Sequence, residues 1–239
     1  MAINSIKRNQ KGFTIVELMI ALAVLSLILI MSTVIMIQIG SLFNKGVTSS
    51  NLQNSTQAVV ADVTSAIQFS GSPVTQNSNN YSYNNNLGQT VVVKAYCIGT
   101  TRYSYVLNHE LGTDSSNNAI TPYILWRDTL TSVNADPACT PANMNPSQGQ
   151  NPSTADENNG IVVQGSGYEM MPNHTQLTAF AITPDTNLGS DIYNIAISTA
   201  YGAADQFDSS GHCIFSLQSS STAFCSTFSV NSTAEGRIY

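Results

Sequence analysis

The feature that most constrains this chain is an uninterrupted apolar run close to its N-terminus. Residues 13–37 read FTIVELMIALAVLSLILIMSTVIMI, with a single charged residue, Glu17, and no Gly or Pro. As a helix that rises 1.5 Å per residue, this run is about 37 Å long, which is enough to cross a hydrocarbon core of about 30 Å. The sequence therefore predicts a membrane-spanning helix at residues 13–37.

Basic residues flank the N-terminal side of this run. Lys7, Arg8 and Lys11 precede it, whereas Lys45 is the nearest cation after it. Loops that carry an excess of Lys and Arg stay on the cytoplasmic side of a membrane. We therefore expect the N-terminus to lie in the cytoplasm and the rest of the chain outside.

Two ordinary explanations of such a segment are a signal peptide and a signal anchor. A signal peptide has an apolar stretch of about 7–15 residues and a small-residue cleavage site at its far end, and residues 37–40, IQIG, offer no such site. A signal anchor accounts for the length and the flanking charges but not for Glu17. A carboxylate costs about 2.5–3.5 kcal/mol near the bilayer centre, so Glu17 should have a partner or a function, unless its side chain simply reaches the headgroups.

The residues around Glu17 carry a more specific pattern. Residues 11–18, KGFTIVEL, resemble the class III signal of type IV pilins, pseudopilins and related filament subunits. This resemblance covers residues 7–37 and includes the basic leader, the Gly-Phe-Thr sequence and Glu at a fixed offset. It implies that an aspartyl prepilin peptidase cleaves between Gly12 and Phe13, and that the new N-terminal Phe13 is N-methylated.

Cleavage would create an α-ammonium on Phe13 close to the Glu17 carboxylate. In a helix bundle that excludes water, opposite charges attract strongly and an unpaired charge is costly. We therefore predict that Glu17 pairs with Phe13 of a neighbouring subunit and sets the axial register of a filament. The partners implied by the resemblance are other pilin subunits, the prepilin peptidase/N-methyltransferase and the inner-membrane pilus assembly platform.

Residues 38–70 continue as a one-sided helix. Apolar side chains recur at spacings near three, four and seven, as on one face of a helix. Gly71 followed by Pro73 is a helix stop signal. Gly40 and Gly46 each weaken a helix by about 1 kcal/mol relative to Ala, so we expect bending or local melting there. The members of the apolar stripe are Leu52, Ala58, Val59, Val63, Ala66 and Ile67.

Residues 71–239 predict a globular head with an antiparallel sheet. Residues 74–89 are Asn-rich and predict a loop, and residues 136–160, with four Pro, predict another. Residues 192–199 alternate in polarity, consistent with one face buried against the helix. Seven segments rich in Val, Ile, Thr and aromatic residues predict strands. These are 90–98, 101–107, 123–126, 161–164, 177–182, 192–200 and 224–230, with a tight turn at 99–100 between the first two.

All four cysteines lie in the head, and their even number suits an exported domain with two disulfides. We prefer the pairs Cys97–Cys139 and Cys213–Cys225, because the short loop between the last two closes easily. The other two connectivities remain open. The cysteines lack the spacing of a metal site, and we predict no bound metal.

The charge balance argues against nucleic-acid binding. The chain has 8 basic and 14 acidic residues, and without Lys7, Arg8 and Lys11 there remain 5 basic residues, which form no stripe that could neutralise phosphates. The sequence contains no Gly-x-Ser-x-Gly, His-Glu-x-x-His or phosphate loop. Asp-containing stretches at 114–117 and 205–211 match no EF-hand. We predict no enzymatic activity and no cofactor.

These features together predict an α+β protein with the type IV pilin fold, in which a long N-terminal helix packs on an antiparallel β-sheet head. The expected parts are a leader at 1–12, a helix at 13–70 (filament core 13–37, amphipathic 38–70) and a head at 71–239.

The predicted function is that of a structural, minor subunit of a type IV pilus, serving filament initiation, adhesion, twitching motility or DNA uptake. No Pro precedes Pro73, and Val34 lies near the mid-helix Pro of many major pilins, which favours a minor subunit. The alternatives are a minor pseudopilin of a type II secretion system and a signal-anchored surface adhesin. The expected location is the cytoplasmic membrane before assembly and an extracellular pilus, or fimbrium, afterwards.

Overall fold

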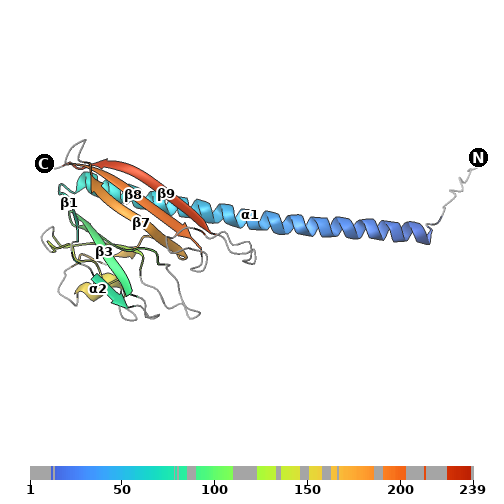
Figure 1. Ribbon diagram of the computed structural model, residues 1–239, viewed down its shortest axis with the longest axis horizontal. Coiled ribbons are helices and arrows are strands. Elements are labelled where there is room, and N and C mark those ends of the chain that lie inside the picture. Colours follow the sequence, from blue (N-terminus) through green and yellow to red (C-terminus); the bar gives the residue numbers. More distant parts are fainter. Residues whose placement is uncertain are drawn as a thin grey trace, which may run out of the picture. The chain divides into compact units, whose positions relative to one another are not determined.

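The computed structural model describes most of the helix and the strands of the head (Figure 1). The chain divides into two units, Met1–Asn44 and Lys45–Tyr239, and each is described by itself. The described residues are 12, 14–77, 79, 81–84, 90–109, 123–132, 136–145, 151–157, 163–165, 167–185, 191–202, 213 and 225–237.

One long helix, α1 (Ile15–Phe69), contains the predicted spanning run and the one-sided segment. The chain is helical at Gly40 and Gly46, so the local melting expected there does not occur. Helix formation is cooperative, and a cost of about 1 kcal/mol per Gly is small beside the many hydrogen bonds of a continuous helix.

The head contains two antiparallel sheets, which confirms the predicted α+β class. In the larger sheet the strand order is β1-β3-β4-β5-β6, and β2 also pairs with β3; in the smaller sheet the order is β7-β8-β9. A short helix, α2 (Pro152–Glu157), precedes β6. The strands are β1 (Val74–Gln76), β2 (Tyr81–Asn84), β3 (Thr90–Ile98), β4 (Thr101–Val106), β5 (Leu125–Thr129), β6 (Tyr168–Glu169), β7 (Thr175–Pro184), β8 (Ile192–Tyr201) and β9 (Ser226–Glu235).

Two of the predicted loops contain regular structure. The prediction of a loop at 74–89 is wrong for β1 and β2, which pair with opposite halves of β3 through Val74↔Ile98 and Tyr81↔Val93. Their Asn-rich surroundings hide them in the sequence, because runs of only three and four residues give too weak a strand signal. Pairing with β3 decides their conformation. The prediction of a loop at 136–160 is likewise wrong for α2.

The strand bounds also differ at several ends. The segment predicted at 123–126 begins later, as β5, and β9 extends past the end expected at 230. Of the strand predicted at 161–164, the structure describes Val163 and Gln164, and Val163 forms an isolated bridge with Leu130. Residues 161, 162 and 224 lie outside the described residues, as do the Asp-containing stretches at 114–117 and 205–211.

The core of the head forms where the C-terminal part of α1 meets both sheets (Figure 1). Phe180 of β7 packs edge-on against Tyr96 and Tyr105 of the larger sheet, with ring centroids 5.4 and 4.9 Å away. Burial of each large aliphatic side chain contributes about 1.5–3 kcal/mol. The helix contributes Val59, Val60, Val63 and Ile67 to this cluster.

The predicted stripe on α1 is correct except at one position. Leu52, Val59, Val63 and Ile67 are buried, and Ala66 packs against the core. Ala58, in contrast, is exposed. The buried face also includes Thr56, whose hydroxyl lies 2.7 Å from that of Thr199 on β8.

Strand β8 shows the alternation expected from its sequence. Tyr193, Ile195, Ile197 and Thr199 are buried, whereas Asn194 is exposed. The buried face of β8 therefore belongs to the same core as the stripe on α1.

The predicted tight turn at 99–100 joins β3 to β4. Gly99 has φ of 60°, as the first central residue of a two-residue II′ hairpin turn requires. A Cβ atom at this position would lie 3.0 Å from the Cβ of Ser70, so glycine also permits the close approach of the hairpin to the end of α1.

Candidate functional site

The first turn of α1 is organised by Thr14 and Glu17. The hydroxyl oxygen of Thr14 accepts a hydrogen bond from the Glu17 backbone N–H at 3.3 Å. Oε2 of Glu17 accepts hydrogen bonds from the Thr14 backbone N–H at 3.0 Å and from the Thr14 hydroxyl at 2.9 Å. This is a capping box, in which Thr at the N-cap and Glu at the third helical position satisfy each other's backbone N–H.

The structure describes two of the three residues predicted for processing and assembly. Gly12 and Glu17 are exposed, and Phe13 lies outside the described residues. A Cβ atom built on Gly12 meets nothing within 4 Å. Packing against the described residues therefore does not require a glycine at position 12. Sequence reasoning identified Glu17 as an unusual charge but did not identify its capping role, although Thr-x-x-Glu before an apolar run is the signature of that motif.

The apolar part of α1 presents its side chains outward on all sides. Nearly every large apolar residue from Ile15 to Phe43 is at least half exposed within the described chain. This is the one described helix long and apolar enough to cross a membrane. Such a continuous apolar surface is not stable in water and requires lipid or other helices around it.

Two disulfides link the head, in the pairing preferred from the sequence. Cys97 on β3 is bonded to Cys139, and Cys213 to Cys225 just before β9. The first bridge attaches the segment 136–145 to the larger sheet, and Cys139 is fully buried there.

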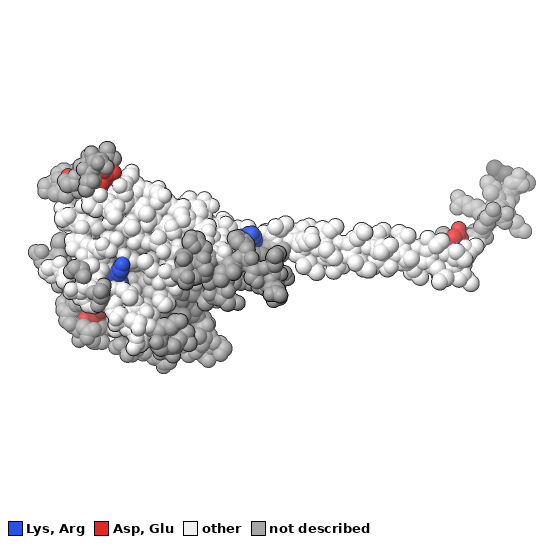
Figure 2. Space-filling model, viewed as in Figure 1, with Lys and Arg blue, Asp and Glu red and all other residues white. Residues whose placement is uncertain are grey.

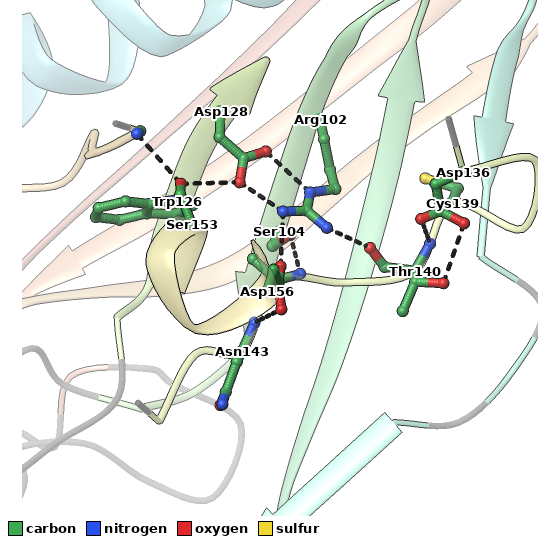
Figure 3. Close-up of polar contacts among 12 residues, drawn as sticks. Arg102, Ser104, Trp126, Asp128, Asp136, Cys139, Thr140, Asn143, Ser153 and Asp156 are labelled. Atoms are coloured by element: carbon green, nitrogen blue, oxygen red, sulfur yellow. Dashed lines mark hydrogen bonds and ion pairs between the residues drawn. The ribbon is translucent and has the colours of Figure 1, made fainter. Parts of the chain in front are cut away.

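A buried ionic cluster, which sequence reasoning missed, lies beside this first bridge (Figure 3). Arg102 on β4 is fully buried and donates to Asp128 of β5 through Nε at 2.9 Å and Nη2 at 2.5 Å. Its Nη2 also lies 2.7 Å from Oδ2 of Asp156 on α2. Arg102 and Asp128 have side chains with 0% exposure, and Asp156 has 5%.

The cluster holds the segments that follow β5 against the sheet. Arg102 Nη1 donates to the Thr140 carbonyl at 3.0 Å, and the Asn143 backbone N–H donates to Asp156 Oδ1 at 3.2 Å. Ser153 donates to Asp128 and accepts from the Trp126 indole N–H at 3.1 Å. The Arg102 guanidinium therefore donates hydrogen bonds to two carboxylates and one carbonyl. Burial raises the pKa of the Asp156 carboxyl, and the nearby Arg102 charge opposes this effect.

A second ion pair joins α1 to β5 in a less buried position. Arg127 Nε lies 2.9 Å from Asp62 Oδ2, with side-chain exposures of 26% and 29%. The same carboxylate accepts the Tyr103 hydroxyl at 2.6 Å. Elsewhere charged side chains are sparse on the face shown in Figure 2, in keeping with a chain of which 9% of residues are charged.

The geometry defines a class of protein: an α+β head linked to a single, outward-facing apolar helix whose first turn carries a carboxylate. Residues 7–33 match the prokaryotic N-terminal methylation motif. Together with the helix and the antiparallel sheets, this match supports a type IV pilin-like protein. Neither the curated proteins nor the solved structures include a match to the chain.

Proposed function

We propose that this protein is a minor subunit of a type IV pilus, made as a membrane-inserted precursor, cleaved between Gly12 and Phe13 and assembled through α1. The observation that carries the proposal is the methylation motif at residues 7–33, which runs directly into a spanning helix with Glu17 in its first turn. The proposed parts are a leader at 1–12, a helix at 13–70 and a head at 71–239.

The exposed apolar surface of α1 supports a role in assembly. Before assembly, the bilayer surrounds this surface, and the basic leader keeps the N-terminus in the cytoplasm. In a filament, the same surface packs against α1 of other subunits. Both surroundings remove apolar area from water, so the helix exchanges one for the other without a large hydrophobic loss.

Glu17 supplies the specific interaction in this assembly. In the single chain its carboxylate caps its own helix through Thr14. Each carboxylate oxygen has two acceptor positions, so Glu17 can retain this cap and also accept from the α-ammonium of Phe13 on a neighbouring subunit. The cap orients the carboxylate at the helix end before the neighbour arrives.

The head has the properties of an exported domain. Both disulfides suit an oxidising compartment, and its surface relies on uncharged polar groups. We propose a structural and not an enzymatic role for the head.

The decisive experiment reads the N-terminus of the mature protein and then locates the protein. We expect mass spectrometry to find N-methyl-Phe13 as the first residue, and to find the leader retained in cells without an active prepilin peptidase. Filaments sheared from the cell surface should contain the subunit at a low ratio to the major pilin. An intact leader in peptidase-positive cells would indicate a signal-anchored protein. Processed protein kept in the envelope, with loss of exported enzymes on deletion, would indicate a pseudopilin.

A further inference from the structure

We propose that a cavity in the head binds a primary alkylammonium group, such as that of a lysine side chain. The cavity has a volume of about 270 Å³, just below the usual range of about 300–1,000 Å³ for small-ligand sites. It lies between β2, β3, the segment 140–144 and α2. Its walls include Tyr81, Tyr83, Val93, Asn143, Met144 and Asp156.

The walls of the cavity are held in place before any ligand arrives. Strand β2 is paired with β3 through Tyr81↔Val93. The opposite wall is fixed by the Ala142 backbone N–H, which donates to the Ser104 hydroxyl at 2.7 Å, and by the Arg102 contact to the Thr140 carbonyl. The disulfide at Cys139 anchors the start of this segment. A preformed site loses little conformational entropy on binding.

The charge around the cavity favours a cation. One guanidinium, that of Arg102, faces two carboxyl groups, those of Asp128 and Asp156, and all three side chains are almost completely buried. Asp156 lines the cavity, and none of the described residues that line it is Lys, Arg or His. A ligand cation next to Asp156 would balance the remaining negative charge in surroundings of low dielectric, where such compensation matters most.

The two tyrosines define the kind of cation. The hydroxyl oxygen of Tyr83 is buried and makes no hydrogen bond with any described residue. The Tyr81 hydroxyl makes one long contact, 3.4 Å to the Thr140 hydroxyl. An ammonium group has three N–H donors and no acceptor, which suits a carboxylate and an unused phenol oxygen. A quaternary ammonium has no N–H and would leave the Tyr83 hydroxyl without a partner.

The same features disfavour other ligands. An anion would meet the unbalanced carboxylate charge. A neutral apolar group would fill the space against Val93 and Met144 but would leave both the charge and the Tyr83 hydroxyl uncompensated. The alkyl stem of a lysine side chain can pack on these apolar walls while its ammonium reaches Asp156.

Binding can be followed through Trp126, because it is the chain's single tryptophan and packs in the same cluster as Val93 and Met144. The full chain, kept in detergent micelles, is titrated with Nα-acetyl-lysine methylamide. The matched probes are Nα-acetyl-norleucine methylamide, which has the same alkyl stem without the ammonium, and Nα-acetyl-Nε-trimethyllysine methylamide, which is quaternary and has no N–H on its ammonium. We expect a saturable fluorescence change with the lysine probe and at least about tenfold weaker binding of the other two, as for loss of a charge-assisted hydrogen bond.

Two variants test the assigned groups. Asp156→Asn keeps an acceptor for Arg102 but removes the charge, and should weaken the lysine probe by about tenfold or more. Tyr83→Phe removes only an unpaired hydroxyl, so the fold should be retained while binding weakens by about 2–10-fold. Asp62→Asn, at the other ion pair, is the control and should bind as the unaltered chain does. Equal binding of the lysine and norleucine probes, binding of the trimethyllysine probe as tight as that of the lysine probe, unaltered affinity in either cavity variant, or no saturable change at all would overturn the proposal.

Discussion

Glu17 closes the first turn of α1 on Thr14, with Oε2 at 3.0 Å from the backbone nitrogen and 2.9 Å from the hydroxyl oxygen. The carboxylate thus caps the helix in the single chain, in addition to the intersubunit role proposed for its charge. A cap of this kind contributes about 0.5–2 kcal/mol to a helix. The two roles can be separated because glutamine also serves in a capping box.

Glu17→Gln should therefore insert into the membrane and be processed normally but fail to enter filaments, as Glu17→Ala should. The amide oxygen of Gln can still accept from Thr14, whereas neither variant can neutralise an incoming α-ammonium, which would be buried unpaired at a cost of several kcal/mol. Immunoblots of sheared filaments and of the processed membrane pool measure both steps. If the Glu17→Gln variant enters filaments normally and the Glu17→Ala variant does not, assembly requires the helix cap and not the charge.

Thr14→Val is the matched variant for the cap. It removes the hydroxyl from the capping box but leaves the Glu17 charge and the Thr14 backbone N–H donor position unchanged. We expect filament incorporation close to that of the unaltered chain. Loss of incorporation comparable to that of Glu17→Gln would show that the conformation of the first turn, and not the ion pair, controls assembly.

Gly12→Val should block removal of the leader. A Cβ atom at position 12 meets none of the described residues within 4 Å, so we expect the substitution to leave the described fold undisturbed and to act at the peptidase. The protein should accumulate as a precursor heavier by residues 1–12 on a denaturing gel, with Gly12→Ala less affected. Complete processing of Gly12→Val would contradict the assigned cleavage site.

Arg102→Leu should destabilise the head by about 3–5 kcal/mol, because it leaves Asp128 and Asp156 buried without a cation. Arg127→Leu on the next strand is the control. Its ion pair with Asp62 is about a quarter exposed, so the loss should be below about 1 kcal/mol. Urea unfolding followed by Trp126 fluorescence gives both values, and equal losses would show that burial of the cluster does not determine its contribution.

The two disulfides should differ in their contribution to stability. Cys97 and Cys139 are 42 residues apart in sequence, and Cys213 and Cys225 are 12 apart. Loop-closure entropy gives about 4 kcal/mol for the first bridge and about 3 kcal/mol for the second. Replacing each pair by alanine and comparing the free energies of unfolding tests the order. Non-reducing peptide mapping of the native chain checks the pairing, and a crossed pairing would refute it.

His109, which follows β4, should make the head less stable as the pH falls. Burial lowers the pKa of its imidazole below the ordinary 6.5. Above 6.5 the imidazole is neutral in both states. As the pH falls below that value the unfolded chain takes up the proton first, so stability is lost. The difference in unfolding free energy between the unaltered chain and His109→Asn should shrink from about pH 8 to about pH 5, and a constant difference would contradict the effect.

The parts predicted correctly are those that depend on neighbours in the sequence. The long N-terminal helix follows from a continuous apolar run, and the methylation motif at residues 7–33 is contained in one short segment. Strand β3 was predicted with its bounds because its nine residues combine β-branched and aromatic side chains. The buried face of β8 was also predicted, because successive side chains of a strand point to opposite faces and its apolar residues alternate.

Other features depend on residues distant in the sequence. Strands β1 and β2 exist because β3 offers each of them one end as a partner. Their Val, Thr and Tyr residues favour a strand, but the Asn-rich residues around them interrupt the pattern. The error at Ala58, in contrast, is one of helical spacing: five residues before Val63, Ala58 lies about 140° around α1 from it.

The sequence by itself thus determined the helix, its first-turn carboxylate, the processing motif and the class of the head. Only the tertiary structure decided the Arg102 cluster and the cavity beside it. Arg102, Asp128 and Asp156 come from β4, β5 and α2, and each looks like an ordinary surface residue in the sequence. Asp128 and Asp156 are 26 and 54 residues away from Arg102 in the sequence. Only the folded sheet and helix bring the three side chains together, and folding removes all of them from water at the same place.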